Sequence, residues 1–390
     1  MDAGADQSVS EGAAVQLAAT GSDSDGDALT YSWSQTSGTA VSLSSLVVSN
    51  PSFTAPDLEA SEVLTFSVTV TAGGVAVSDD VSVSVLNVSM PDYAAQFETD
   101  SLTGDPEIVS CTIGGAETSC LSVTLKSSPG GTYTVGPFCP RTTNDTAEDS
   151  GVWMTSDASD TTVYDADGAF VTNLSTLYDD TWQMFDPVTN EVFYTESAAE
   201  CQLAANPDPD PSLFNHCVEC LVEYLDEGLS QTYLIPLNPV DAATVNTNTS
   251  YGVAFSGVIF DRSAPLAIIE SNNNIAPFDD CGGHINPNVG YHIHAVTDGC
   301  LAEIENTRGH AAQIGVALDG YPMFEQLNGE SEPTDLDQCR GHSSDVDTYN
   351  LDVGYHYHVN APGENQILPC LTGEVEGEAD AGGPPGGPPG

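Results

Sequence analysis

The sequence predicts a mainly β protein built from an N-terminal β-sandwich and a larger, disulfide-rich, mostly β domain. Short runs of alternating apolar and polar residues, separated by turns rich in Gly, Asp and Ser, fill the N-terminal part. All ten cysteines lie between Cys111 and Cys370. A motif of the form Cys-x-Gly-His…Val-Gly-Tyr-His-x-His…Cys occurs twice in the later part. A chain of 390 residues, 40% of them hydrophobic, is long enough for two or three domains with cores of their own.

Residues 2–88 are predicted to form the sandwich. Runs such as LTYSWSQ, VLTFSVTV and VSVSVLNV alternate, and no helical period interrupts them. Trp33 stands in the middle of one run and is expected to fill the core. The stretch resembles the PKD-type and related Ig-like modules of extracellular proteins in DSDGDALTYSWSQTSG, NPSFTAPD and the closing VSVSV. The resemblance implies a spacer or an adhesion unit rather than a catalyst.

An acidic turn in this module is a candidate calcium loop. Asp23, Asp25 and Asp27 alternate in SDSDGD, and oxygen ligands at every second position of a loop suit Ca²⁺. No downstream Glu completes an EF-type loop, so a solvated acidic turn is the alternative interpretation.

The charge of the chain excludes two classes of partner. The sequence has 58 acidic and five basic residues, for a net charge of −53. Nucleic-acid phosphates and anionic membrane surfaces are both bound through clustered Lys and Arg, which this composition does not provide. Saline water screens such self-repulsion while the charge keeps the protein soluble. This favours a marine or halophilic source over the alternative, an acidic exoprotein of fresh water.

The cysteines indicate a secreted or cell-surface protein in an oxidising compartment. An even number of cysteines in a chain rich in Thr, Ser, Asp and Gly is typical of disulfides. The N-terminal MDAGADQSVS has no signal-peptide pattern, and we take it as a mature form. No apolar run of about 18 residues is present, so no membrane insertion is expected.

The repeated motif predicts two disulfides. They are Cys281–Cys300 and Cys339–Cys370, with crossed pairing between the copies as the alternative. Cys111 and Cys120 are expected to staple a hairpin. The four other cysteines are expected to form two further disulfides, although His216 beside the first member of the Cys-x-x-Cys pair leaves a zinc or redox site as the alternative. These four are Cys139, Cys201, Cys217 and Cys220.

The remaining chain divides into a linker, a second domain and a tail. Residues 89–98 are the expected linker and residues 99–375 the expected domain, while the acidic and then Gly/Pro-rich segment 376–390 has low complexity. One helix is predicted near 212–227, where Ser212 supplies a cap and apolar residues follow one stripe.

Seven of the eight histidines lie in the 75 residues that hold the repeated motif. The first copy is CGGHINPNVGYHIHAVTDGC at 281–300, and the second is CRGHSSDVDTYNLDVGYHYHVNAPGENQILPC at 339–370. A third Gly-His pair stands between the copies. The candidate metal ligands are His284, His292, His294, His310, His342, His356 and His358.

The spacing His-x-His predicts a metal site if the motif is a strand. Alternate side chains of a strand share a face and lie about 7 Å apart along the backbone, so two imidazoles can converge on one ion. Pairing of the two copies as neighbouring strands would bring four imidazoles to one face. The intervening tyrosines would then pack on the opposite face. The alternative is a polar core in which the histidines only form hydrogen bonds.

Copper is the predicted metal and zinc the alternative. Disulfide-bonded cysteines offer no thiolate, so the ligands are neutral nitrogens, which suit copper, zinc, iron or nickel. Copper lies at the top of the affinity order, and an oxidising compartment favours Cu(II).

The window resembles the YHYH domain family of secreted proteins. The defining match is Tyr355-His356-Tyr357-His358, supported by GGHINPNVGYHIH, IGVALDGYPMFE and LDQCRGH. The first copy carries Ile293 where the second carries Tyr357. The resemblance covers roughly 99–375 and is specific around 281–370. Metal binding is implied by the histidines and not by the family name.

Three functions are compatible with these observations. The first is an extracellular copper-binding protein, in its strongest form a copper-dependent oxidoreductase whose open coordination position admits O₂, peroxide or a small molecule. The second is a surface or matrix structural protein with a stabilising metal site and cell-surface association. The third is a zinc-dependent hydrolase that uses a metal-bound water of pKa near 7.

Overall fold

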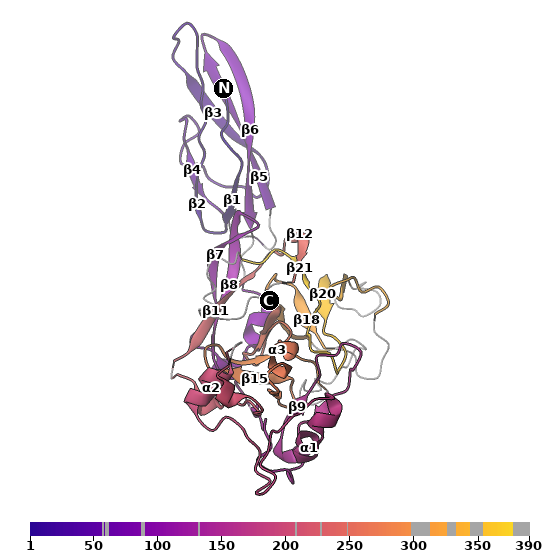
Figure 1. The fold of residues 1–390 in the computed structure, drawn as a ribbon. Helices are drawn as coiled ribbons and strands as arrows, with labels where there is room; N and C mark the ends of the chain where they lie inside the picture. Colours follow the sequence, from indigo (N-terminus) through magenta and orange to yellow (C-terminus); the bar gives the residue numbers. More distant parts are fainter. Residues whose placement is uncertain are drawn as a thin grey trace. The chain divides into compact units, whose positions relative to one another are not determined.

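The computed structural model describes most of the chain and is mostly β, which confirms the predicted fold class (Figure 1). Two compact units are present. The first comprises Met1–Pro91 with Ile108–Leu121 and Pro236–Asn238, and the second comprises the rest. The described residues are 1–56, 58, 62–86, 90–131, 133–206, 209–226, 228–247, 249–297, 313–325, 333–343 and 354–376.

The first unit contains a β-sandwich. A four-stranded sheet has the order β1-β6-β5-β3, in which β1 runs parallel to β6 and the other pairs are antiparallel. A two-stranded sheet pairs β2 with β4. The strands are β1 (Gln7–Ser10), β2 (Ala14–Gln16), β3 (Thr30–Ser37), β4 (Ser52–Thr54), β5 (Glu62–Ala72) and β6 (Val75–Leu86).

Alternating residues of these strands form the core of the sandwich. Leu64, Phe66 and Val68 of β5 are fully buried, while the residues between them are partly exposed. Trp33 is buried in the same core, and its indole Nε1 donates a hydrogen bond to the carbonyl of Val48 at 2.9 Å. The period of two in the sequence therefore does place one side of each strand in the core.

A disulfide-closed hairpin follows in the chain. Strands β7 (Glu107–Ile113) and β8 (Ala116–Lys126) are neighbours in a three-stranded sheet of order β11-β8-β7, with β11 at Ser230–Pro236. Gly114 and Gly115 form the turn with positive φ angles, which glycine adopts without strain. The structure has a disulfide between Cys111 and Cys120, one in each strand.

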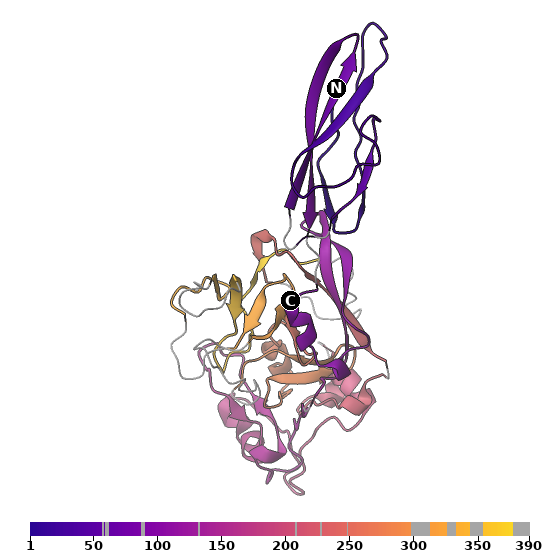
Figure 2. The same cartoon turned by 180° about the vertical axis from the view of Figure 1, so that it is seen from behind.

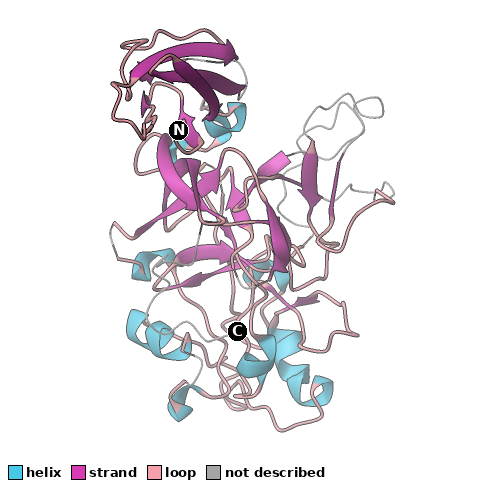
Figure 3. Ribbon diagram, turned by 90° about the horizontal axis from the view of Figure 1, so that it is seen from above, coloured by secondary structure: helices cyan, strands magenta, loops and turns pink. Residues whose placement is uncertain are grey.

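The second unit is organised around an eight-stranded sheet, whose strands are magenta in Figure 3. Its order is β15-β16-β14-β13-β17-β18-β20-β19. The strands are β13 (Gly252–Ala254), β14 (Ile259–Phe260), β15 (Gly283–Asn286), β16 (Gly290–Ile293), β17 (Gln313–Ala317), β18 (Pro322–Phe324), β19 (Gly341–Ser343) and β20 (Tyr355–His358).

This order is that of two four-stranded repeats arranged about the central pair β13 and β17. In each repeat a hairpin (β13–β14 or β17–β18) is followed by a second hairpin at the sheet edge (β15–β16 or β19–β20). The strands that join the hairpins are parallel in both repeats. Figure 2 shows the second repeat in orange and yellow. The duplication thus includes two strands more per copy than the histidine motif alone.

The remaining strands and helices are short. Strand β9 (Val152–Trp153) pairs with β10 (Tyr164–Asp165), and β12 (Asp241–Asn246) pairs with β21 (Leu371–Gly373). The helices are α1 (Gly168–Leu177), α2 (Ala198–Ala204) and α3 (Leu266–Glu270), with 3₁₀ turns η1 (Asp92–Gln96), η2 (Thr99–Ser101), η3 (Ala147–Asp149), η4 (Pro211–Leu213) and η5 (Val222–Tyr224). Among the described residues no helix is long and apolar enough to cross a membrane.

The helix predicted near 212–227 is wrong. That segment contains only η4 and η5, and the residues between them are extended. Disulfides Cys139–Cys217 and Cys201–Cys220 tie it to other parts of the unit. Its apolar stripe is buried by these cross-links rather than by helical periodicity.

Candidate metal centre

Each copy of the repeat builds its own group of three histidines at one edge of the sheet. In the first copy His284 of β15 lies directly opposite His292 of β16, and His294 follows two residues later on the same face. In the second copy His342 lies directly opposite His356, with His358 two residues later. We call these groups the first triad and the second triad. Within the described residues, these are the two groups whose ligand atoms converge closely enough to hold a metal ion.

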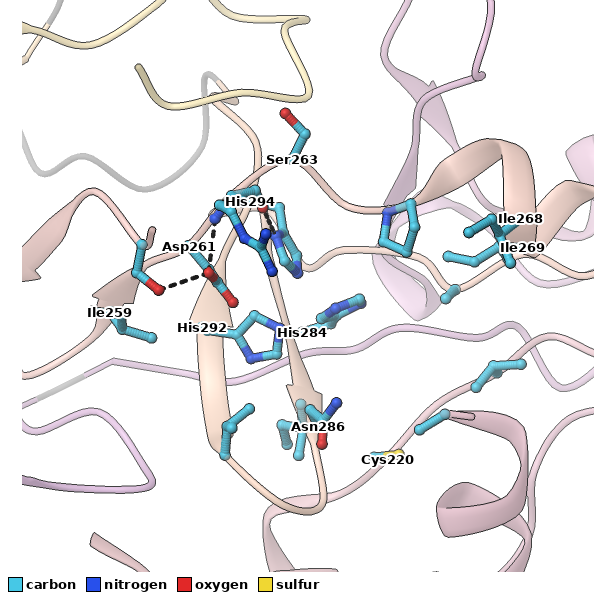
Figure 4. A pocket seen from close by; sticks show the side chains of 18 of the residues that line it. Cys220, Ile259, Asp261, Ser263, Ile268, Ile269, His284, Asn286, His292 and His294 are labelled. Carbon is cyan, nitrogen blue, oxygen red and sulfur yellow. Dashed lines mark hydrogen bonds between the residues drawn. The ribbon is translucent and has the colours of Figure 1, made fainter. Parts of the chain in front are cut away.

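The rings of the first triad face one another (Figure 4). The ring centroids of His284 and His292 are 4.9 Å apart, those of His284 and His294 are 5.0 Å apart, and those of His292 and His294 are 4.5 Å apart. Neighbouring planes are inclined by 74–88°. Candidate ligand atoms from the three rings all lie within 4.8 Å of one another.

Hydrogen bonds fix which nitrogen faces the centre of the first triad. His292 Nδ1 donates to the carbonyl of Gly290 at 3.0 Å, and His294 Nδ1 donates to the carbonyl of Arg262. Because a carbonyl only accepts, the neutral rings carry hydrogen on Nδ1 and a lone pair on Nε2. A backbone acceptor on the outer nitrogen is the usual support of a metal-binding histidine.

Burial keeps these imidazoles neutral. Burial first, and then the neighbouring His292 and His294, hold the pKa of His284 well below its ordinary value. Burial, followed by the proximity of His292, lowers the pKa of His294 to about 4. Neutral imidazole is the form that binds metal, so protonation competes less here than at an exposed histidine.

The second triad is tighter and more deeply buried. His342, His356 and His358 are 6%, 0% and 1% exposed. His342 Nε2 is 3.0 Å from His356 Nε2 and 3.2 Å from His358 Nε2. An ion with bonds of about 2.0–2.1 Å and angles near 100° holds its nitrogen ligands about 3.1 Å apart. The spacing of the three nitrogens is therefore that of one face of a coordination polyhedron.

The outer nitrogens of this triad all face acceptors. His342 Nδ1 contacts Asp335 Oδ1 at 3.0 Å, His356 Nδ1 contacts the carbonyl of Gly354 at 3.0 Å, and His358 Nδ1 contacts that of Glu325 at 3.4 Å. With hydrogen on each Nδ1, three lone pairs point at one another, which is unfavourable unless a cation or a proton lies among them.

The same carboxylate–tyrosine clamp supports both triads. Asp279 Oδ1 accepts hydrogen bonds from the amides of Cys281 and Gly283 and from the hydroxyl of Tyr291. Burial raises the pKa of Asp279 to about 6, against the opposing effect of these donors. The clamp fixes the Gly-His turn against the His-x-His strand.

Asp337 repeats this arrangement in the second copy. It accepts from the amides of Cys339 and Gly341 and, at 2.6 Å, from the hydroxyl of Tyr355. Tyr357, which has no counterpart in the first copy, is fully buried and donates to Asp319 at 2.6 Å. The tyrosines therefore serve as hydrogen-bonding core residues behind the strand.

The expectation that the two copies pair with each other is wrong. The hairpins β15–β16 and β19–β20 occupy opposite edges of the sheet, with four other strands between them. Each His-x-His pair instead combines with the Gly-His of its own copy. His310 lies outside the described residues, as does Cys300, while Cys281 is disulfide-bonded. The structure has a disulfide between Cys339 and Cys370.

The acidic turn of the N-terminal unit forms no such group. Asp23 Oδ1 accepts the backbone amides of Asp25 and Asp27 at 2.9 and 3.0 Å, and these hydrogen bonds lower its pKa. The three aspartates do not converge as ligands in the described part of the chain. Calcium binding there stays a prediction.

One charged neighbour of the first triad was missed by the sequence reasoning. Asp261 follows β14, and its Oδ1 accepts hydrogen bonds from Ser250 Oγ and the amide of Arg262, both at 2.8 Å (Figure 4). Burial opposes ionisation of Asp261, but nearby His292 and His294 outweigh it, so its pKa is lowered. The signal was present: GVAFSGVIFDR at 252–262 repeats GVALDGYPMFE at 315–325.

The first triad borders a cavity of about 1010 Å³ within the second unit. Asp261 and Arg262 line it beside the three histidines. Its remaining wall is made largely of neutral side chains, several with amide or hydroxyl groups. Examples are Gln231, Thr249, Asn274, Asn286 and Gln366. Cavities of this size at a cluster of convergent polar groups are typical of ligand sites.

Comparison with known families defines the class of both units. Residues 3–85 match a PKD domain family, and residues 232–333 match the YHYH protein family. Both resemblances inferred from the sequence are confirmed, in the predicted order. The YHYH match includes the whole first triad and ends before Tyr355–His358, which contains the motif itself.

No curated protein sequence matches the chain. Among solved structures, a nucleoside hydrolase-related hypothetical protein from Saccharophagus degradans is 27% identical over 20% of this chain and 22% of its own, with a TM-score of 0.19. The 2,6-sialyltransferase of Photobacterium sp. JT-ISH-224 is 21% identical over 22% and 18%, with a TM-score of 0.18. The PKD domain of the KIAA 1837 protein is 23% identical over 23% and 88%, with a TM-score of 0.20.

The chain spans about a fifth of the length of the first two of these proteins. Similarity at these TM-scores carries no argument about structure or activity. The function must therefore be argued from the histidines.

Proposed function

We propose that this protein binds two transition-metal ions, one at each histidine triad, and that the ion is copper. The observation that carries the proposal is the convergence of three Nε2 atoms in the second triad, at 3.0 and 3.2 Å, while every Nδ1 faces an acceptor. Hydrogen bonds between neutral rings cannot account for this arrangement, because each Nε2 offers a lone pair and no hydrogen.

Copper is favoured over zinc by the ligand set and the compartment. Three neutral imidazoles without a thiolate suit Cu(II), which binds most tightly of the divalent first-row ions. The described disulfides and the PKD domain are consistent with an extracellular, oxidising location. A three-histidine site leaves a coordination position for O₂, peroxide or a small molecule, as a copper-dependent oxidoreductase requires.

Metal analysis and electron paramagnetic resonance of the purified native protein test this proposal. We expect two ions per chain and a Cu(II) spectrum with nitrogen couplings. His356→Ala with His358→Ala should remove one ion, and His292→Ala with His294→Ala the other. His216→Ala is the matched control, because His216 belongs to neither triad and its Nδ1 contacts the carbonyl of Phe214. Two silent ions per chain would point to zinc, and no ions to a polar core without metal.

A structural metal role is the second candidate, and the burial of the second triad favours it for that site. His356 and His358 are almost fully enclosed, as is usual for ions that stabilise a fold. A matrix or cell-surface protein stabilised in this way would show metal-dependent stability without metal-dependent turnover. Zinc with hydrolytic activity remains the third candidate, separated from the first by the identity of the ion.

A further inference from the structure

The two triads differ at one equivalent position of the repeat. The register pairs Phe260 with Ile293 in the first copy and Met323 with Tyr357 in the second. Asp261 and Phe324, the next residues, are therefore equivalent. The position after them agrees, since His294 contacts the carbonyl of Arg262 and His358 that of Glu325. A carboxylate beside the first triad thus takes the place of a phenyl ring beside the second.

The phenyl ring covers the second triad. Phe324 is 4% exposed, and its ring centroid lies 4.9 Å from that of His356 and 6.1 Å from that of His358. The face of the histidines on this side is therefore occupied by an apolar group that offers no ligand. An ion held there would have little access to exchangeable ligands.

The first triad has the opposite surroundings. All three of its histidines border the cavity of about 1010 Å³, together with Asp261. Figure 4 shows the Asp261 carboxylate beside His292 and His294. A carboxylate at this point accepts hydrogen bonds and repels anions, and the net charge of −53 adds to that repulsion.

We propose that the first triad is an open centre that takes an exchangeable, neutral, hydroxyl-bearing ligand from the cavity, and that the second triad is a closed structural centre. The inference rests on the proposed metal binding and adds a division of roles between the two sites. Asp261 is the residue that selects the ligand, because it accepts a hydrogen bond from a hydroxyl group or water and disfavours an anion. The amide and hydroxyl groups of Gln231, Thr249 and Asn286 on the cavity wall match such a ligand.

The test uses the full chain, stripped with a chelator and reloaded with Cu(II), and titrated with imidazole and with azide. Electron paramagnetic resonance and the azide charge-transfer band report each site. We expect imidazole to change only one of the two copper signals. The responding signal should be absent from the His292→Ala/His294→Ala variant and retained in the His356→Ala/His358→Ala variant. His216→Ala should behave as the unaltered protein.

Two further variants test the position that distinguishes the copies. Asp261→Asn removes the negative charge and should strengthen azide binding at the first triad about tenfold, with a smaller effect on neutral imidazole. Phe324→Ala should make the second copper signal responsive to imidazole. Equal responses of both signals in the unaltered protein, or azide binding unchanged by Asp261→Asn, would overturn the inference while leaving metal binding intact. Failure of either triad to take up copper would instead overturn the proposed function, and this inference with it.

Discussion

Replacing Cys339 and Cys370 together by alanine tests how much the second triad depends on its covalent frame. This disulfide joins residues separated by 31 positions, and the enclosed segment contains all three histidines of the triad. In the chain-entropy account, releasing a loop of this length lowers the free energy of unfolding by about 4 kcal/mol. The freed segment must also be ordered when the ion binds, so copper affinity at this triad should fall at least about tenfold.

Cys111→Ala with Cys120→Ala is the matched control. These cysteines are separated by nine positions in the β7–β8 hairpin, and neither belongs to a metal group. The same account gives a loss of about 2.5 kcal/mol. Both triads should keep their copper affinity in this variant, because no histidine lies in the closed loop.

Urea denaturation and calorimetric copper titration provide the two readouts. Fluorescence of the buried Trp153 reports unfolding of the second unit in metal-free protein. The account predicts one weakened and one unaltered copper site after loss of Cys339–Cys370. It is refuted if both sites keep their affinity, or if the two sites weaken equally.

Three other predictions concern buried groups. Burial raises the pKa of Asp319 from 3.8 to about 6, so the folded chain keeps a proton that the unfolded chain has lost between about pH 4 and 6. The free energy of unfolding should fall by about 3 kcal/mol through that range from this group alone, and Asp319→Asn should remove that fall; parallel urea midpoints of variant and parent at pH 4 and 7 would disprove it. Arg141→Ala should cost about 2–3 kcal/mol in urea denaturation, because it leaves the buried carboxylate of Glu219 without its partner at 2.5 Å; an unchanged midpoint would contradict the pairing. Gly341→Ala should lower the melting temperature, since a Cβ there would overlap the hydroxyl of Tyr355, and an unshifted melting curve would count against the clamp.

The local geometry of the triads could be read from the sequence. The spacing of His292 and His294 places both rings on one face of a strand, and the duplication indicates that the spacing is no accident. Alternation likewise predicted the buried residues of the sandwich, Trp33 among them. These features depend on the period of two in a strand, which a sequence displays directly.

The arrangement of the strands could not be read in the same way. Neighbouring strands in the sheet are set by long-range hydrogen bonds, so nothing local to His292 or His356 shows that six positions of the sheet order separate β16 from β19. The wrong helix near 212–227 has a related cause. Its apolar stripe fits a helical period, but disulfides from Cys217 and Cys220 to distant parts of the chain hold it extended.

Asp261 was missed because attention stayed on the histidine motif. The repeat GVAFSGVIFDR and GVALDGYPMFE contains the hairpin that precedes each motif, and aligning the two places Asp261 opposite Phe324. A duplicated motif is therefore best extended outward until the similarity ends. The positions that then differ are the candidates for a difference in role.

Anomalous diffraction from crystals of the native protein, recorded at the copper absorption edge, tests the central claim most directly. The account predicts two peaks per chain, one among the Nε2 atoms of His342, His356 and His358 and one among the rings of His284, His292 and His294. A single peak shared by both copies of the repeat, or peaks remote from both triads, would contradict it.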